Sequence, residues 1–171
     1  MKTKSKVMMV LLILMMVFVS DVFSQALNNE EIKSLKGLKS VFVIVEALSS
    51  DVEKDGLKQS QIKTEVELKL RMAGIKVQNE DEWFNEPWAP FLQVSVTPLK
   101  NEAISNYSYS FGVSLYQYVV LTSDTDIIIP AITWQSISLG IVGSRNVAII
   151  RNLVEEKIDM FINDYLTANP K

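Results

Sequence analysis

Runs of apolar residues, and runs that alternate apolar with polar positions, predict five β-strands. Residues 40–48 contain five consecutive apolar and mostly β-branched side chains, typical of a strand covered on both faces. Residues 91–98 and 107–121 alternate regularly, as half-exposed antiparallel strands do, and we expect these two strands to form a long hairpin. Fifteen extended residues would span about 50 Å, so the second strand should bend or bulge near Gly112 or Gln117.

The other two predicted strands are less regular. Residues 75–78 form a short apolar stretch directly after Gly74. Residues 128–139 carry Pro130 near their start, and because proline cannot donate a ladder hydrogen bond, it favours an edge strand. The loop at residues 49–56 separates the first strand from the first helix.

Apolar residues at three- and four-residue spacing predict two amphipathic helices. The first contains Ile62, Val66, Leu70 and Ala73 and should end at Gly74, which suits a left-handed C-cap. The second ends before Pro170, and its apolar stripe is Val147, Ile150, Val154, Ile158, Phe161 and Tyr165.

This order of elements predicts an α/β (α+β) fold, a two-layer sandwich. We expect a mixed, mostly antiparallel five-stranded sheet with both helices on one face. The serines, Gln93 and Thr97 would line the other face, which is then either solvated or used for docking. We expect residues 25–39 to be a polar lead-in and residues 40–169 to form a single domain.

The first 24 residues have the pattern of a secretory signal peptide. Lys2, Lys4 and Lys6 precede an apolar run at residues 7–19, and small residues follow, so cleavage is expected after Ser24 or Ala26. The apolar run is shorter than the roughly 20 residues that cross a bilayer, so no stable membrane anchor is expected. The protein should be exported, to the periplasm or the medium.

Charge and composition narrow the functional classes. The chain has 17 basic and 20 acidic residues, and removal of residues 1–24 leaves 14 and 19, a net charge of −5. An acidic balance argues against nucleic acid and anionic membranes as partners. The chain has no cysteine and no histidine, which excludes disulfides, thiol nucleophiles, Ser-His-Asp catalysis and most transition-metal sites. We therefore expect no catalytic residues, no metal and no cofactor.

The turn before the last helix is the candidate ligand-binding site. Gly140 and Gly143 should turn the chain there, and Ser144 should cap the helix. Unpaired backbone N–H groups at the start of that helix, in the stretch with Gly140, Gly143, Ser144, Arg145 and Asn146, could then hold an anion. The residues predicted to bind a ligand are Gly143, Ser144, Arg145 and Trp134. The alternative is an ordinary strand-to-helix turn, which uses the same residue types, and that interpretation is favoured.

Residues 79–90 combine acidic side chains, two prolines and three large aromatic residues, Trp83, Phe84 and Trp88. The segment should be a loop or a single short helical turn. Its aromatic residues could form a recognition loop, but large aromatic side chains are usually buried, so we expect them to plug one end of the core.

Two acidic clusters resemble calcium ligands only in part. Asp51, Glu53 and Asp55 have EF-hand-like spacing, but Ile62 occupies the position of the essential bidentate glutamate, so a solvated loop is expected. Asp124 and Asp126 are too few for a metal site and fit a hairpin turn stabilised by aspartate side chains.

The chain contains the motifs Gly37-Leu38-Lys39, Val66-Glu67-Leu68-Lys69-Leu70-Arg71, Ala73-Gly74-Ile75, Ala89-Pro90, Thr133-Trp134, Val142-Gly143-Ser144, Phe161-Ile162-Asn163 and Asn169-Pro170. These motifs resemble a family of short exported bacterial proteins without an established activity. The resemblance covers most of the chain after residue 24, and it implies export. At the level of element order the chain is also similar to the TolB N-terminal domain and to LptE-type envelope assembly domains, which implies a small envelope domain, although the chain lacks the anchoring cysteine of LptE.

Two functions from different classes follow. The preferred one is an exported, non-catalytic binding or assembly module that docks a protein or envelope component through its open sheet face or sheet edge. The alternative is a small-ligand binder or a carboxylate-dependent enzyme that uses the aromatic loop, Tyr116, Tyr118 or the turn at Arg145. The sequence does not set the oligomeric state.

Overall fold

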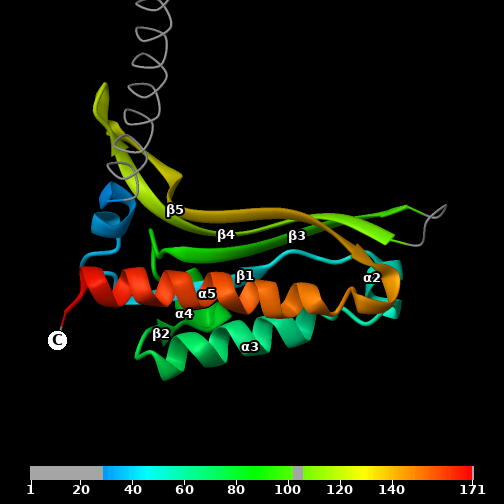
Figure 1. The fold of residues 1–171 in the computed structure, drawn as a ribbon. Coiled ribbons are helices and arrows are strands. Elements are labelled where there is room, and N and C mark those ends of the chain that lie inside the picture. The colour runs from blue at the N-terminus through cyan, green and yellow to red at the C-terminus, as the bar shows by residue number, and fades with distance from the viewer. Residues whose placement is uncertain (1–28, 102–105, 171) are drawn as a thin grey trace, which may run out of the picture.

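The fold is the predicted two-layer sandwich, with a five-stranded mixed sheet and two long helices on one of its faces (Figure 1). The structure, a computed structural model, describes residues 29–101 and 106–170, so the predicted signal peptide and its cleavage sites lie outside the described residues. In chain order the strands are β1 (Ser40–Val45), β2 (Lys76–Val77), β3 (Phe91–Asn101), β4 (Asn106–Leu121) and β5 (Asp124–Gly143).

The strand order in the sheet is β2-β1-β3-β4-β5. Strand β1 pairs parallel with β2 and with β3, whereas β3, β4 and β5 pair antiparallel in succession. The long β3–β4 hairpin is confirmed, and its pairing extends to Asn101 opposite Asn106. Strand β5 lies at an edge, as the proline in it predicted.

Helices α3 (Gln59–Met72) and α5 (Ile149–Ala168) lie side by side against the sheet (Figure 1). Ion pairs join them: Lys69 Nζ lies 2.7 Å from Asp159 Oδ1 and 3.6 Å from Glu155 Oε2, and Arg151 Nε lies 3.3 Å from Glu65 Oε2. Burial alone would lower the pKa of Lys69, but the hydrogen bonds and charges of Asp159 and Glu155 together outweigh it and raise that pKa. Within the described residues, no helix combines the length and the apolar character needed to cross a membrane.

The predicted end of the first helix is confirmed. Gly74 has a φ of 84°, a left-handed conformation that glycine adopts without a Cβ penalty. The Ile75 N–H donates to the Leu70 carbonyl at 3.0 Å, and Ile75 is 1% exposed, so the chain turns back onto the last turn of α3.

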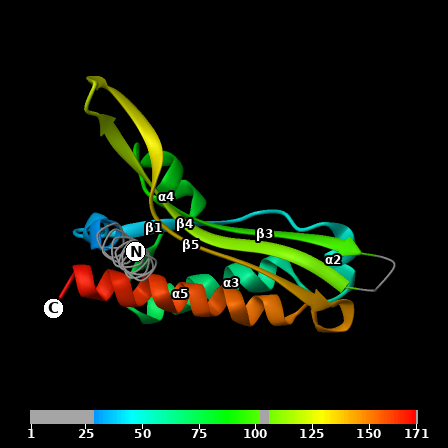
Figure 2. The ribbon, with the colours of Figure 1, turned by 45° about the horizontal axis from the view of Figure 1, so that its top comes forward.

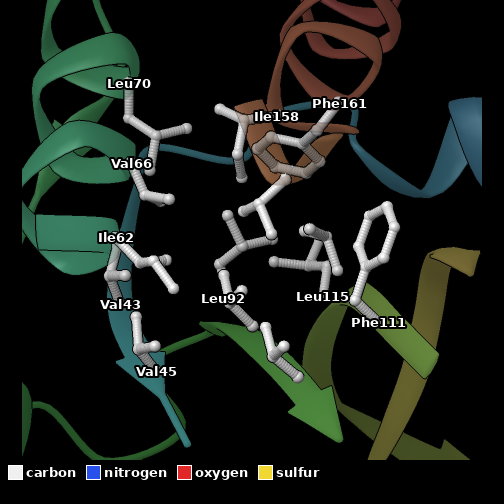
Figure 3. Packing of buried hydrophobic residues seen from close by; sticks show 14 of the residues in the cluster. Val43, Val45, Ile62, Val66, Leu70, Leu92, Phe111, Leu115, Ile158 and Phe161 are labelled. Carbon is white, nitrogen blue, oxygen red and sulfur yellow. The ribbon is translucent and has the colours of Figure 1, made fainter. Parts of the chain in front are cut away.

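The core lies between the sheet and the two long helices (Figure 3). Val43 of β1, Leu92 of β3 and Leu115 of β4 point toward Ile62 of α3 and Phe161 of α5, and all five are fully buried. The predicted apolar faces of β3, β4 and both helices therefore form this core, and each buried aliphatic or aromatic side chain stabilises it by about 1.5–3 kcal/mol.

The domain begins before residue 40, so the prediction of a polar lead-in at residues 25–39 was wrong. Leu35 is 0% and Leu38 is 7% exposed, and both belong to the core. The Asn169 side chain holds this segment, because its Oδ1 accepts from the Gly37 N–H at 2.7 Å and its Nδ2 donates to the Leu35 carbonyl at 2.9 Å. Two leucines among charged residues do not form the repeating apolar pattern of a strand or a helix, so their burial could not be predicted from the sequence.

Two helical segments were not predicted, and a third lies where a loop or a single short helical turn was expected. Helix α2 (Ser50–Lys54) replaces the predicted loop, because Val52 anchors it in the core at 1% exposure. Helix α4 (Glu80–Asn85) begins with a capping box, in which the Asn79 side chain accepts a hydrogen bond from the Glu82 N–H. Residues 29–34 are also helical.

Strand β5 is longer than predicted, and the predicted turn at Gly140 and Gly143 was wrong, because both glycines lie inside the strand. Gly140 pairs with Tyr109 of β4, and a Cβ at this position would lie 2.6 Å from the Tyr109 ring carbon Cζ. The glycine is therefore needed for the close approach of an aromatic ring rather than for a turn.

The predicted irregularity in β4 is confirmed near Gln117. The β4–β5 register shifts between Leu115 and Tyr116, which leaves Thr133 of β5 as a bulge with no residue of β4 opposite it. Beyond the bulge, residues 116–132 form the end of the hairpin, which we call the hairpin arm. Figures 1 and 2 show that the arm bends out of the sheet on the side away from α3 and α5.

Candidate functional site

The predicted cap at Ser144 was wrong. Residues Ser144–Asn146 form a single 3₁₀ turn (η1), and α5 begins only at Ile149, with Ala148 as its N-cap. The extra turn places Val147, which is fully buried, in the core. Gly143 and Arg145 are exposed, and neither they nor Ser144 form the N-terminus of the long helix.

Trp134 is a core residue on the helix-covered face of the sheet. It is 2% exposed, and its ring packs edge-on against Phe161 with centroids 5.1 Å apart. Its Nε1 donates to Asp164 Oδ2 at 2.8 Å. Trp134 and Gly143 lie nine residues apart on one extended strand, about 30 Å. The structure therefore does not bring the four candidate residues together into one site.

The prediction that the aromatic residues 83, 84 and 88 plug the core was wrong. Phe84 is 74% and Trp88 is 58% exposed. Only Trp83 packs inward, because it stacks on Phe42 at 4.7 Å between ring centroids and so covers the β1 end of the sheet face opposite α3 and α5. Phe84 lies on the exposed side of α4, and Trp88 lies in the loop that follows this helix.

The two exposed aromatic residues differ in their contacts. Trp88 has a φ of 70°, which is unusual for a bulky residue, and its ring lies edge-on to Tyr118 at 4.9 Å. This contact joins the loop after α4 to the hairpin arm, and it leaves most of the indole accessible for recognition.

A shallow cavity of about 240 Å³ lies beside the same loop. It is smaller than the roughly 300–1,000 Å³ of typical small-molecule sites. Two lysines and one glutamate give it a mixed charge, and Trp134 and Arg145 are not part of it. Its walls are Lys36, Gly37, Leu38, Lys39, Ser40, Glu86, Pro90 and Gln117.

The acidic clusters are structural. Asp126 N–H donates to Asp124 Oδ1 at 3.1 Å, which confirms the turn stabilised by aspartate. Asp55 ends α2 and accepts from the Tyr107 hydroxyl at 2.7 Å and from Lys100 Nζ at 3.2 Å. Across the described ranges, no three carboxylates are grouped so that they could hold a metal ion.

The Tyr107 hydrogen bond, followed by that of Lys100, lowers the pKa of Asp55. Burial raises the pKa of Tyr107, and Asp55 adds to that effect. A carboxyl group with a lowered folded-state pKa stabilises the fold above its unfolded pKa of about 3.9, and this contribution is lost as pH falls through the lower folded value. The contact joins α2 to β4 and therefore makes the fold sensitive to acid.

We expect Asp55→Asn to lose stability at pH 7 and to show a smaller decrease between pH 5 and pH 2 than the wild type. Tyr107→Phe should shift the acid response in the same direction, because it removes the main cause of the lowered pKa. Urea unfolding at a series of pH values measures both effects, with Tyr109→Phe as the control that keeps the contact. Identical pH slopes for wild type and Asp55→Asn would contradict this account.

The sheet face opposite α3 and α5 is largely open and polar at its centre. Cross-strand pairs place Gln93 beside Ser114, Ser95 beside Gly112, and Thr97 beside Ser110, as the alternation predicted. Within this row the side chain of Gln135 on β5 donates to Ser114 Oγ at 3.0 Å.

The edge of this open face is apolar. Ile137, Leu139 and Ile141 of β5 are 54%, 78% and 71% exposed, and we call these three residues the edge strip. The strip was not predicted, because the strand was expected to end at residue 139 and serines were expected to dominate the face. Alternation carried through Gly140 to Gly143 would have revealed it.

The hairpin arm is apolar on both of its faces. Between Asn106 and Ser144 the only charged residues are Asp124 and Asp126 at the tip. A two-stranded ribbon has no core of its own, so its exposed apolar side chains are available to a partner. The most exposed of them are Val120, Ile127, Ile128, Ile129 and Ile132.

Comparison with models of protein families, with curated proteins and with solved structures finds no match to this chain. The resemblance to a family of exported proteins and to envelope assembly domains therefore remains a prediction. Function must be inferred from the surface of the molecule itself.

Proposed function

We propose that the protein is an exported, non-catalytic binding or assembly module of the cell envelope. It docks a protein or another envelope component through the open face of the sheet and the parts of β4 and β5 that border it. The observation that carries this proposal is the exposure of bulky aliphatic side chains on the hairpin arm, which are between 39% and 52% exposed.

The exposed apolar residues lie close together, on both faces of the two-stranded arm. Ile127, Ile128 and Ile129 follow one another in β5, and Val120 pairs with Ile128 across the hairpin. Soluble monomers rarely expose large contiguous apolar patches, and such patches usually mark interaction sites. The arm projects from the sandwich, so a partner can reach both of its faces (Figure 2).

The chemistry of the chain supports binding over catalysis. Histidine and cysteine are absent from the sequence, and the lowered pKa of Asp55 belongs to a contact that ties α2 to β4. The alternative, a small-ligand binder or carboxylate-dependent enzyme, has the small cavity beside the aromatic loop in its favour.

Site-specific photocrosslinking in the exporting cell tests the proposal. A photoreactive phenylalanine analogue would replace Ser110 on the open face or Ile128 on the arm, with Glu156 on the exposed side of α5 as the matched control. We expect both test positions to form an adduct with one and the same envelope component, and the control to form none. The crosslinked protein should also be recovered from the periplasm or the medium.

Two results would overturn the proposal. One is the absence of adducts, other than dimers of this chain, at both test positions. The other is an equal adduct pattern at the control position, because the binding would then not depend on the open face or the arm.

A further inference from the structure

The outer edge of β5 is uncharged and unprotected over residues 134–143. Proteins usually protect sheet edges with lysine, proline or bulges, because unpaired backbone N–H and C=O groups recruit further strands. Pro130 and the Thr133 bulge interrupt β5 nearer the tip. From Trp134 to Gly143, however, there is neither a charge nor a proline.

The edge strip lies along this same segment. Each of its residues lies opposite a small residue of β4. Ile137 pairs with Gly112, Leu139 with Ser110 and Ile141 with Ser108. The side chains of the strip therefore project further from the sheet than those of their neighbours on β4. In the described part of the chain, no strand lies on the outer side of β5.

The pattern of the strip identifies the strand that fits it. Residues 137–141 read Ile-Ser-Leu-Gly-Ile, so apolar and small residues are arranged symmetrically about Leu139. In an antiparallel pair with a two-fold axis, each residue lies opposite the residue at the same distance on the other side of the axis. Apolar residues therefore face apolar residues only if the sequence is symmetric about that axis. Because the segment has no charge, two copies of this acidic chain can approach there without like charges facing each other.

We propose that the β5 edge binds a second copy of this chain, in an antiparallel pair with a two-fold axis near Leu139. Leu139 then lies opposite its own copy, and Ile137 lies opposite Ile141 of the other chain, all on the open face. The result is a continuous ten-stranded sheet in which Gly143, the last residue of β5, lies opposite Gln135 of the other chain, so the pairing ends just before the Thr133 bulge on each side.

The dimer has a consequence for the open face. A two-fold axis perpendicular to the sheet keeps both helix layers on one side and both hairpin arms on the other, since each arm bends away from α3 and α5 (Figures 1 and 2). The inference is independent of the proposed function, because a dimer that binds no envelope component would leave the pairing intact while the function failed.

Cysteine crosslinking tests the proposal directly. The natural chain has no cysteine, so a disulfide in a single-cysteine variant can only join two chains. Opposite residues of an antiparallel pair have Cβ atoms about 4.5–5.5 Å apart, close enough for a disulfide after a small adjustment. We expect Leu139→Cys to form a dimeric disulfide rapidly under mild oxidation, and a mixture of Ile137→Cys and Ile141→Cys to form the mixed dimer.

Leu99→Cys is the matched control. Leu99 lies on the same open face and is 68% exposed, but it belongs to the inner strand β3. We expect it to crosslink at least tenfold more slowly than Leu139→Cys. Equal rates for the two variants would overturn the proposal, because they would reflect random collisions.

Sedimentation of the unmodified protein gives an independent readout. The wild type should sediment as a dimer at micromolar concentration, and Leu139→Arg should sediment as a monomer with an unchanged circular dichroism spectrum. A wild-type protein that remains monomeric throughout the accessible concentration range would overturn the proposal, as would a dimer that persists in Leu139→Arg.

Discussion

Replacing Trp134 with alanine is expected to lower the free energy of unfolding by about 3–5 kcal/mol, a large part of the roughly 5–15 kcal/mol of a typical domain. The substitution removes the largest fully buried side chain and leaves a cavity against Phe161 of α5. It also removes the hydrogen bond from Nε1 to Asp164 Oδ2, the polar contact by which this side chain joins β5 to α5.

Trp134→Phe separates the two contributions. It keeps an aromatic ring beside Phe161 but lacks the indole N–H, so we expect a smaller loss than for alanine. Urea unfolding followed by circular dichroism measures both variants. Wild-type stability in Trp134→Ala would contradict the role of Trp134 in the core and would reopen a ligand-binding role for this residue.

Replacing Leu92 with alanine is expected to cost about 2–5 kcal/mol, whereas Leu139→Ala should change stability by no more than about 0.5 kcal/mol in dilute solution. The chemical change is identical at the two sites. Leu92 of β3 is 0% exposed in the core between the sheet and the two long helices, while Leu139 is 78% exposed on the edge strip. The comparison therefore separates apolar residues that stabilise the fold from apolar residues that are exposed on it.

This measurement must be made at protein concentrations too low for self-association, because dimerisation stabilises the folded state by mass action. Denaturant midpoints with a common slope give the two differences directly. A large loss for Leu139→Ala in the dilute monomer would mean that the edge strip belongs to the core, contrary to its exposure.

The sandwich could be predicted from sequence because its core strands and helices each bury one face. Val94 and Val96 follow Leu92 at a spacing of two on β3, and Val66 and Leu70 follow Ile62 at a spacing of four on α3. Burial imposes these two periods whatever the rest of the chain does. The edge position of β5 followed from Pro130, because a proline has no N–H to donate to a neighbouring strand.

The errors arose where local signals have two meanings. Glycine suits both a turn and a close approach, and Gly140 serves the second because the Tyr109 ring occupies the space above it. Serine suits both a helix cap and a surface turn, and Ser144 lies in a 3₁₀ turn because the buried Val147 requires one. Only tertiary contacts decide between such alternatives.

The proposed binding surface was predicted only in outline. The sequence indicated an open face lined by serines and Gln93, and the structure confirms it. It did not indicate that Leu139 and Ile141 would extend that face as an apolar edge, because side-chain exposure at an edge depends on which strand ends the sheet. The Trp88 ring was expected in the core because large aromatic side chains are usually buried. Residue type alone did not show that the loop after α4 leaves this ring exposed.

Hydrogen exchange along β5 at two protein concentrations tests the central claim most directly, namely that this edge exists to pair with another strand. We predict that the backbone amides of residues 134–142 that point away from β4, about every second one, exchange measurably in dilute protein and become protected as concentration rises, while the amides of residues 92–96 that bond neighbouring strands stay protected throughout. Exchange in residues 134–142 that does not change with concentration, in a protein that remains monomeric, would contradict the claim.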